Sequence, residues 1–133
     1  MYGNAIKFVP ICMMMQDLKT CKEIATSISK HADEGHVVVI ASSDFTHYEP
    51  HDVATKNDEL AIDAITRLDS SKLNALGETD QVSMCGYGPI TTLMEVAKSK
   101  SRVKPQFLAY HTSGEITGEK DSVVGYASLL FSR

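Results

Sequence analysis

The 133-residue sequence lacks several features that mark specialised classes of protein. No apolar run reaches the roughly 18 residues of a membrane span, and no stretch has the form of a signal peptide. Its formal net charge of -4 argues against non-specific binding to nucleic acid, which needs a basic surface. We therefore expect a cytoplasmic protein that binds neither membranes nor nucleic acids.

Cysteine is also scarce, and the three cysteines form no C-x-x-C pair (Cys12, Cys21 and Cys85). Without a secretory signal, a disulfide framework is not expected, so a cysteine with a function would act as a thiolate or a metal ligand. A P-loop, a dinucleotide glycine fingerprint and a G-x-S-x-G elbow are all missing, and Gly86-Tyr87-Gly88 is too short to replace them. No nucleotide cofactor is expected.

What is present is typical of one globular domain over residues 1–133, with 43% hydrophobic and 23% charged residues. The apolar patterns predict an α/β fold, a layered α/β/α arrangement with a mixed β-sheet. Strands are expected at Ala5–Met14, His36–Ala41, Gln106–His111 and Ser122–Phe131, the last two forming an antiparallel hairpin. Helices are expected after Asp17, over 51–68 and 70–76, and from about Pro89.

Two of these helices carry specific expectations. Asp17 is a candidate cap for the first, which should bury Cys21 as a small core residue and end at Gly35. In the helix over 51–68, charged residues lie on one face, which we interpret as a solvated surface. These residues are Lys56, Asp58, Glu59, Asp63 and Arg67.

Asp44 and His47 follow the apolar run Val37–Ala41, which is typical of a fully buried strand. In open α/β sheets, ligands bind at the carboxyl ends of the strands, so an acid and a histidine here are candidate site residues. The structural alternative is equally open at this point. Asp44 could cap the following helix while His47 forms a hydrogen bond in a loop.

Cys85 is the second candidate, because Pro89 places it just before a helix N-terminus, where the helix dipole favours a thiolate. The alternative is a buried, inert thiol. With His47 it would provide ligands for iron, copper or zinc, and Asp44 could orient the histidine. Two ligands do not complete a zinc site. A Cys–His nucleophile and base is a further alternative.

Three separate motifs resemble those of the Memo family over nearly the whole chain. They are Ser42-Ser43-Asp44-Phe45-Thr46-His47-Tyr48, Met84-Cys85-Gly86-Tyr87-Gly88-Pro89-Ile90, and Thr112–Gly118 together with Ser122–Ala127. The resemblance covers only the C-terminal half of the family's pattern, so we expect a C-terminal portion of a larger domain. It implies a fold similar to the catalytic subunit of class III extradiol dioxygenases.

The resemblance also implies that His47 and Cys85 bind a metal with histidines from the other half. Asp44 would stand beside them, and Tyr110 and Asp121 would line the pocket. The implied function is a metal-binding protein with oxidoreductase-type activity. The alternatives are a binding or adaptor module that recognises a peptide or protein partner through the same pocket, and a Cys–His hydrolase. Because half a domain exposes apolar surface, we expect a homo-oligomer or pairing with a missing N-terminal half.

Overall fold

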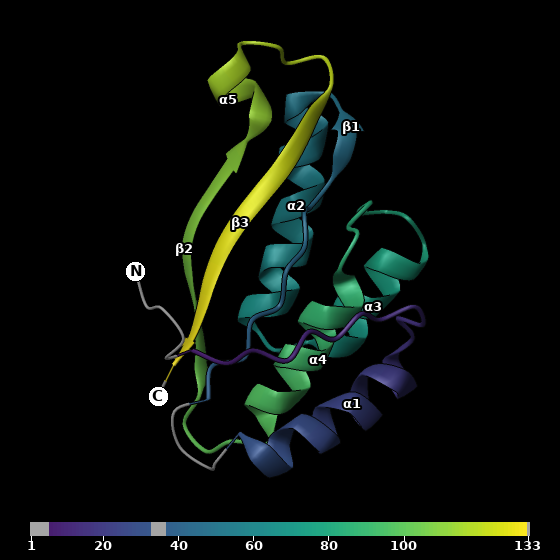
Figure 1. Ribbon diagram of the computed structural model, residues 1–133. Helices are drawn as coiled ribbons and strands as arrows, with labels where there is room; N and C mark the ends of the chain where they lie inside the picture. Colours follow the sequence, from purple (N-terminus) through teal and green to yellow (C-terminus); the bar gives the residue numbers. More distant parts are fainter. Residues whose placement is uncertain (1–5, 33–36, 133) are drawn as a thin grey trace.

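The computed structural model describes residues 6–32 and 37–132, which form an α/β fold. Figure 1 shows a long hairpin with helices packed on one side of it. In chain order, the elements are α1 (Leu18–His31), β1 (His47–Glu49), α2 (His51–Thr66), α3 (Ser70–Glu78), α4 (Tyr87–Lys98), β2 (Lys104–Thr112), α5 (Ser113–Thr117) and β3 (Val123–Ser132). Helix α2 packs against β2 and β3, and α1 packs against α4.

The three described strands pair in the order β1-β3-β2, and both pairings are antiparallel. The predicted hairpin between the last two strands is therefore confirmed. Its connection contains the short helix α5, which begins at a capping box formed by Thr112 and Glu115. It ends at Gly118, whose φ of 80° lies in the left-handed region that favours glycine.

The two N-terminal strands were predicted wrongly. Residues 6–16 and 37–46 belong to no strand or helix, and Ala5 and His36 lie outside the described residues. The side chains of Phe8, Val38 and Ile40 are 83%, 81% and 81% exposed. An apolar run becomes a buried strand only when neighbouring strands and covering layers are available. Among the described residues, 6–15 and 37–40 have no strand neighbours, so the sheet is antiparallel rather than mixed.

The core lies between the helices and β3, and the prediction for the first helix is largely confirmed. Asp17 caps α1 by accepting a hydrogen bond from the Thr20 backbone, and Cys21 is fully buried. Helix α1 ends at His31, and Gly35 lies outside the described residues. The main core cluster contains Phe45, Ala61, Ala64, Ile65, Leu73, Leu76, Val82, Met84, Ile90 and Met94.

Asp58 departs from the predicted solvated face of α2, because its side chain is fully buried. Its Oδ1 accepts hydrogen bonds from the backbone N–H and the hydroxyl of Thr46, and its Oδ2 accepts one from the Tyr110 hydroxyl. Helical periodicity turns Asp58 toward the sheet beside Ala54 and Ala61, which are also buried. Burial raises the pKa of Asp58, although these hydrogen bonds act in the opposite direction.

The raised pKa of Asp58 predicts a pH-dependent stability difference between the wild type and Asp58→Asn. The native state holds a proton on Asp58 more readily than the unfolded state, so this carboxyl favours folding most at low pH. Its contribution decreases as the pH rises above the ordinary value of 3.8. Each unit of pKa difference corresponds to about 1.4 kcal/mol.

Urea unfolding at several pH values should therefore show Asp58→Asn gaining stability relative to the wild type between about pH 4 and pH 7. Asp121→Asn, at an exposed residue, is the control for loss of a surface charge. The raised pKa would be contradicted if the difference in free energy of unfolding between the wild type and Asp58→Asn stayed constant with pH. It would also be contradicted if Asp58→Asn lost stability relative to the wild type as the pH rises.

Candidate metal centre

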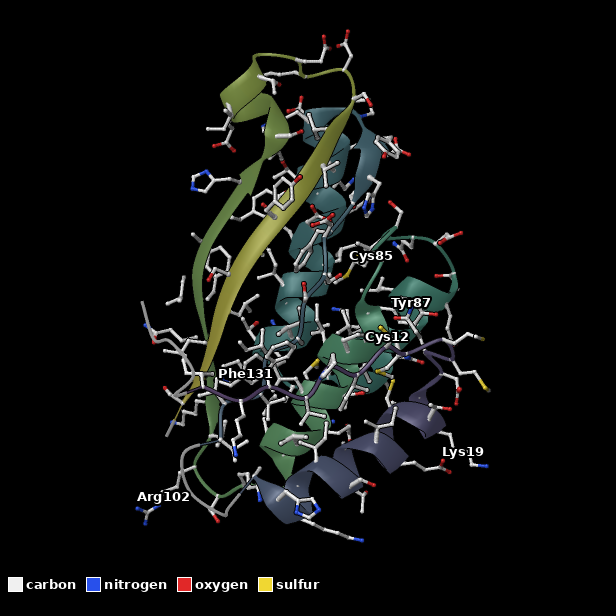
Figure 2. The ribbon with its side chains drawn as sticks, viewed as in Figure 1. Cys12, Lys19, Cys85, Tyr87, Arg102 and Phe131 are labelled. Carbon is white, nitrogen blue, oxygen red and sulfur yellow. The ribbon has the colours of Figure 1, made fainter. Side chains whose placement is uncertain are left out.

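Asp44, His47 and Cys85 come together in the structure as a compact group of potential metal ligands. One ligand atom from each lies within 4.8 Å of the other two. Asp44 lies on the segment that leads into β1, His47 is the first residue of β1, and Cys85 lies just before α4. Figure 2 shows Cys85 beside the segment that enters β1. Two stretches about 40 residues apart in sequence therefore form one site, which we call the Asp44–His47–Cys85 cluster.

The orientation of His47 is set by Ser83. The Nδ1 atom of His47 lies 2.6 Å from the Ser83 carbonyl oxygen, and the His47 backbone N–H donates to the Ser83 hydroxyl at 2.8 Å. A carbonyl only accepts hydrogen bonds, so Nδ1 carries the proton in this contact. In the neutral ring, Nε2 then presents its lone pair, and it lies 3.7 Å from Asp44 Oδ2. This is the arrangement by which proteins prepare a histidine for a metal.

Cys85 is held against the same segment by backbone and hydroxyl contacts. The Asp44 backbone N–H donates to Cys85 Sγ at 3.2 Å, and the Ser43 hydroxyl lies 3.7 Å from that sulfur. The Ser43 oxygen also accepts from the Gly86 backbone N–H. A Cβ at Gly86 would lie 2.6 Å from the Ser42 carbonyl oxygen, so this close approach requires glycine.

The segment before α1 contacts the start of α4 through the side chain of Gln16. Its side-chain oxygen accepts a hydrogen bond from the Gly88 backbone N–H, and its nitrogen donates to the Cys85 carbonyl. The start of α4 is thus held by groups from two distant segments. Cys85 itself remains exposed, so the alternative of a buried, inert thiol is excluded.

The donor atoms of the cluster fit a transition-metal ion. Thiolate, imidazole and carboxylate together suit iron, zinc or copper, and three protein ligands leave positions open for a further ligand or substrate. The side chain of Asp44 is half-exposed, and that of His47 is largely covered. Asp44 does not cap α2, whose N-cap is Pro50 and has no side-chain cap bond.

The geometry gives less support to a Cys–His nucleophile. Among the described residues, the hydrogen bonds of Cys85 Sγ join it to Ser43 and Asp44, and none joins it to His47. A general base must reach the proton that it removes, which requires about 2.6–3.2 Å. The Nδ1 atom of His47 is also already bonded to Ser83.

The other predicted pocket residues do not join the cluster. The Tyr110 hydroxyl donates to Asp58, and burial followed by this contact raises the pKa of Tyr110. Asp121 is exposed in the connection before β3. His111 contacts Glu115, and His51 contacts Thr112, at the end of the hairpin that carries α5.

Sequence reasoning missed Ser83, Ser43 and Asp58. Ser83 lies in the connection between α3 and α4, directly before the motif that begins at Met84. Asp58 was assigned to a solvated face. Nothing local distinguishes a serine or aspartate that supports a site from one on the surface, because these contacts span 12 to 43 residues of sequence.

With the site described, comparison with known proteins shows which family shares this pattern. The family model described as Memo-like protein matches residues 2–130. MEMO1 family proteins of Methanopyrus kandleri and Pyrobaculum aerophilum are each 44% identical over 99% of this chain, covering 47% and 48% of their own lengths. A MEMO1 family protein of Methanocaldococcus jannaschii is 45% identical over 93% of the chain and 44% of its own length.

The chain thus spans about half the length of these relatives. The matched region includes the segment with Asp44 and His47, the start of α4 with Cys85, and the β2–β3 hairpin. Because the family model matches almost the entire chain, the match shows family membership. The chain belongs to the Memo-like protein family.

Proposed function

We propose that this Memo-like protein binds a metal ion through the Asp44–His47–Cys85 cluster. The observation that carries the proposal is the orientation of His47. The Ser83 carbonyl holds the proton on Nδ1, so the lone pair of Nε2 faces the Asp44 carboxylate 3.7 Å away, with Cys85 Sγ in the same group. Three electron-pair donors that converge in this way favour a cation between them.

Iron or copper is the proposed ion, with zinc as the alternative, because thiolate and imidazole suit all three. A redox-active ion held here would supply one-electron chemistry, which supports an oxidoreductase-type activity. The chain's own residues would bind the ion, orient the imidazole through Ser83 and leave one side open to solvent. The free cysteines also suit a reducing compartment such as the cytoplasm.

Metal binding is tested with Co²⁺, whose bond to a thiolate gives a charge-transfer absorption band. The wild type should bind one Co²⁺ and show this band. Cys85→Ser should lose it, and His47→Ala should weaken binding by more than the roughly tenfold that is typical when only an outer partner of a ligand is lost. Cys12→Ser is the matched control, because Cys12 is an exposed thiol outside the cluster. Stoichiometric binding by a variant with both Cys85 and His47 replaced by alanine would refute the proposal.

The same variants separate metal binding from hydrolase chemistry. A hydrolase would acylate Cys85 with an activated ester and would need His47 as the base. Because no hydrogen bond is seen between these two side chains, we expect His47→Ala to leave the rate of Cys85 labelling within about twofold. The measurement is mass spectrometry of the labelled protein over time. Loss of labelling in His47→Ala would favour the hydrolase.

A second proposal is that the chain binds a further polypeptide through its exposed apolar segments. Residues 6–15 and 37–40 are extended chain without strand partners in the described structure, and most of their large apolar side chains are exposed. Exposed apolar surface of this kind marks a polypeptide interface. We assign it to the part of a Memo-length protein that lies outside this chain, since the relatives are about twice as long.

Without that partner, the chain by itself should self-associate through these segments. Sedimentation at increasing concentration should show dimers or larger species, and a variant with Val38→Lys and Ile40→Lys should shift them toward monomer. Ile116→Lys is the control, because Ile116 is 90% exposed on α5, away from both segments. A wild-type chain that stays monomeric at high concentration would contradict this interface.

A further inference from the structure

Asp58 is a buried carboxylate that the proposed metal binding does not yet use. Its Oδ1 accepts from the Thr46 backbone N–H at 2.9 Å and from the Thr46 hydroxyl at 2.6 Å. Its Oδ2 accepts from the Tyr110 hydroxyl at 2.8 Å. Each oxygen therefore has a different partner, and the two partners lie on different segments. We call these contacts the Thr46 arm and the Tyr110 arm.

The Thr46 arm reaches the backbone of the metal-binding segment directly. Thr46 precedes His47 and lies two residues after Asp44, so its position affects both candidate ligands. The same stretch is bonded to β3, because Phe45 N–H donates to the Gly125 carbonyl and Gly125 N–H donates to the Thr46 carbonyl. The segment is thus held by the strand on one side and by a carboxylate of α2 on the other.

The packing around Gly125 is arranged to admit this carboxylate. A Cβ at Gly125 would lie 1.9 Å from Asp58 Oδ2, so any larger residue would displace the side chain. Burying a carboxylate between a helix and a strand costs free energy, because the charged group loses its hydration. An apolar side chain of similar volume could fill the same space without this desolvation penalty. What the carboxylate adds is directional contact with the Thr46 backbone and hydroxyl.

We propose that Asp58 is a positioning residue for the Asp44–His47–Cys85 cluster, acting through its Thr46 arm. By holding Thr46, Asp58 fixes the backbone on either side of it. The side chains of Asp44 and His47 are thereby kept close to Cys85, which precedes α4. The inference rests on the proposed metal binding. A structural role alone would make both arms equally important, since each ties α2 to a neighbouring segment.

The two arms can be removed separately by nearly isosteric changes. Thr46→Val deletes the hydroxyl of the Thr46 arm, and Tyr110→Phe deletes the donor of the Tyr110 arm. Asp58→Asn keeps a carbonyl oxygen that can accept both bonds from Thr46, so it serves as the conservative rescue. The measurements are Co²⁺ affinity, urea unfolding and amide hydrogen exchange of the metal-free protein.

Thr46→Val should weaken Co²⁺ binding by about tenfold, the range for loss of an outer contact that orients a ligand. Tyr110→Phe should lower the free energy of unfolding about as much as Thr46→Val does, but should leave Co²⁺ affinity within about twofold. Asp58→Asn should also leave Co²⁺ affinity within about twofold, because its carbonyl oxygen keeps both bonds from Thr46. Equal changes in affinity for Thr46→Val and Tyr110→Phe, or no change for Thr46→Val, would overturn the positioning role.

Hydrogen exchange separates failure of this inference from failure of metal binding. The Asp44 amide donates to Cys85 Sγ. Its exchange rate therefore reports whether the segment with Asp44 stays in contact with Cys85. Thr46→Val should accelerate exchange at Asp44 in metal-free protein more than Tyr110→Phe does. If the wild type binds no Co²⁺ through Cys85 but this difference is found, positioning stands and metal binding fails. If exchange at Asp44 is equal in both variants, positioning fails.

Discussion

The backbone of Phe45 and Thr46 is the point on which the rest of this structure depends. Phe45 places its ring in the main core cluster, and both residues exchange hydrogen bonds with Gly125 of β3. Asp58 of α2 holds Thr46 from the other side. The core, the sheet and helix α2 therefore all contact this dipeptide. Because its backbone is held in place, the positions of the adjacent residues Asp44 and His47 are fixed as well.

The residues of the Asp44–His47–Cys85 cluster are held in place mainly by backbone groups and small hydroxyls. Ser83 sets the tautomer of His47, and the hydroxyl of Ser43 bridges to the N-terminus of α4, while glycine at position 86 permits the approach. Short side chains lose little conformational freedom when they are fixed, so they can hold ligands accurately at low entropic cost. The result is an exposed but oriented set of donors, as expected for a metal that must meet a further ligand.

The exposed segments 6–15 and 37–40 are connected to the site through the chain. They lead directly into Gln16, which bonds to the start of α4, and into the segment that carries Asp44 and His47. A polypeptide bound along them would therefore reach the neighbourhood of the cluster. The relatives are about twice as long as this chain, and we proposed above that their additional part is this polypeptide. Partner binding and metal binding are thus physically connected in our proposal, and the two need not be alternatives.

Local pattern in the sequence determined helices α1 to α4, the cap at Asp17, the burial of Cys21 and the β2–β3 hairpin, because periodicity and turn chemistry act over a few residues. The motifs also singled out Asp44, His47 and Cys85, and the family resemblance made them specific. Tertiary structure alone decided the rest. It left Val38 and Ile40 exposed, since burial of a strand depends on neighbours that no local pattern encodes, and it buried Asp58 by turning that position toward the sheet. It also brought Ser83 to His47, a contact across 36 residues that only the folded chain can form.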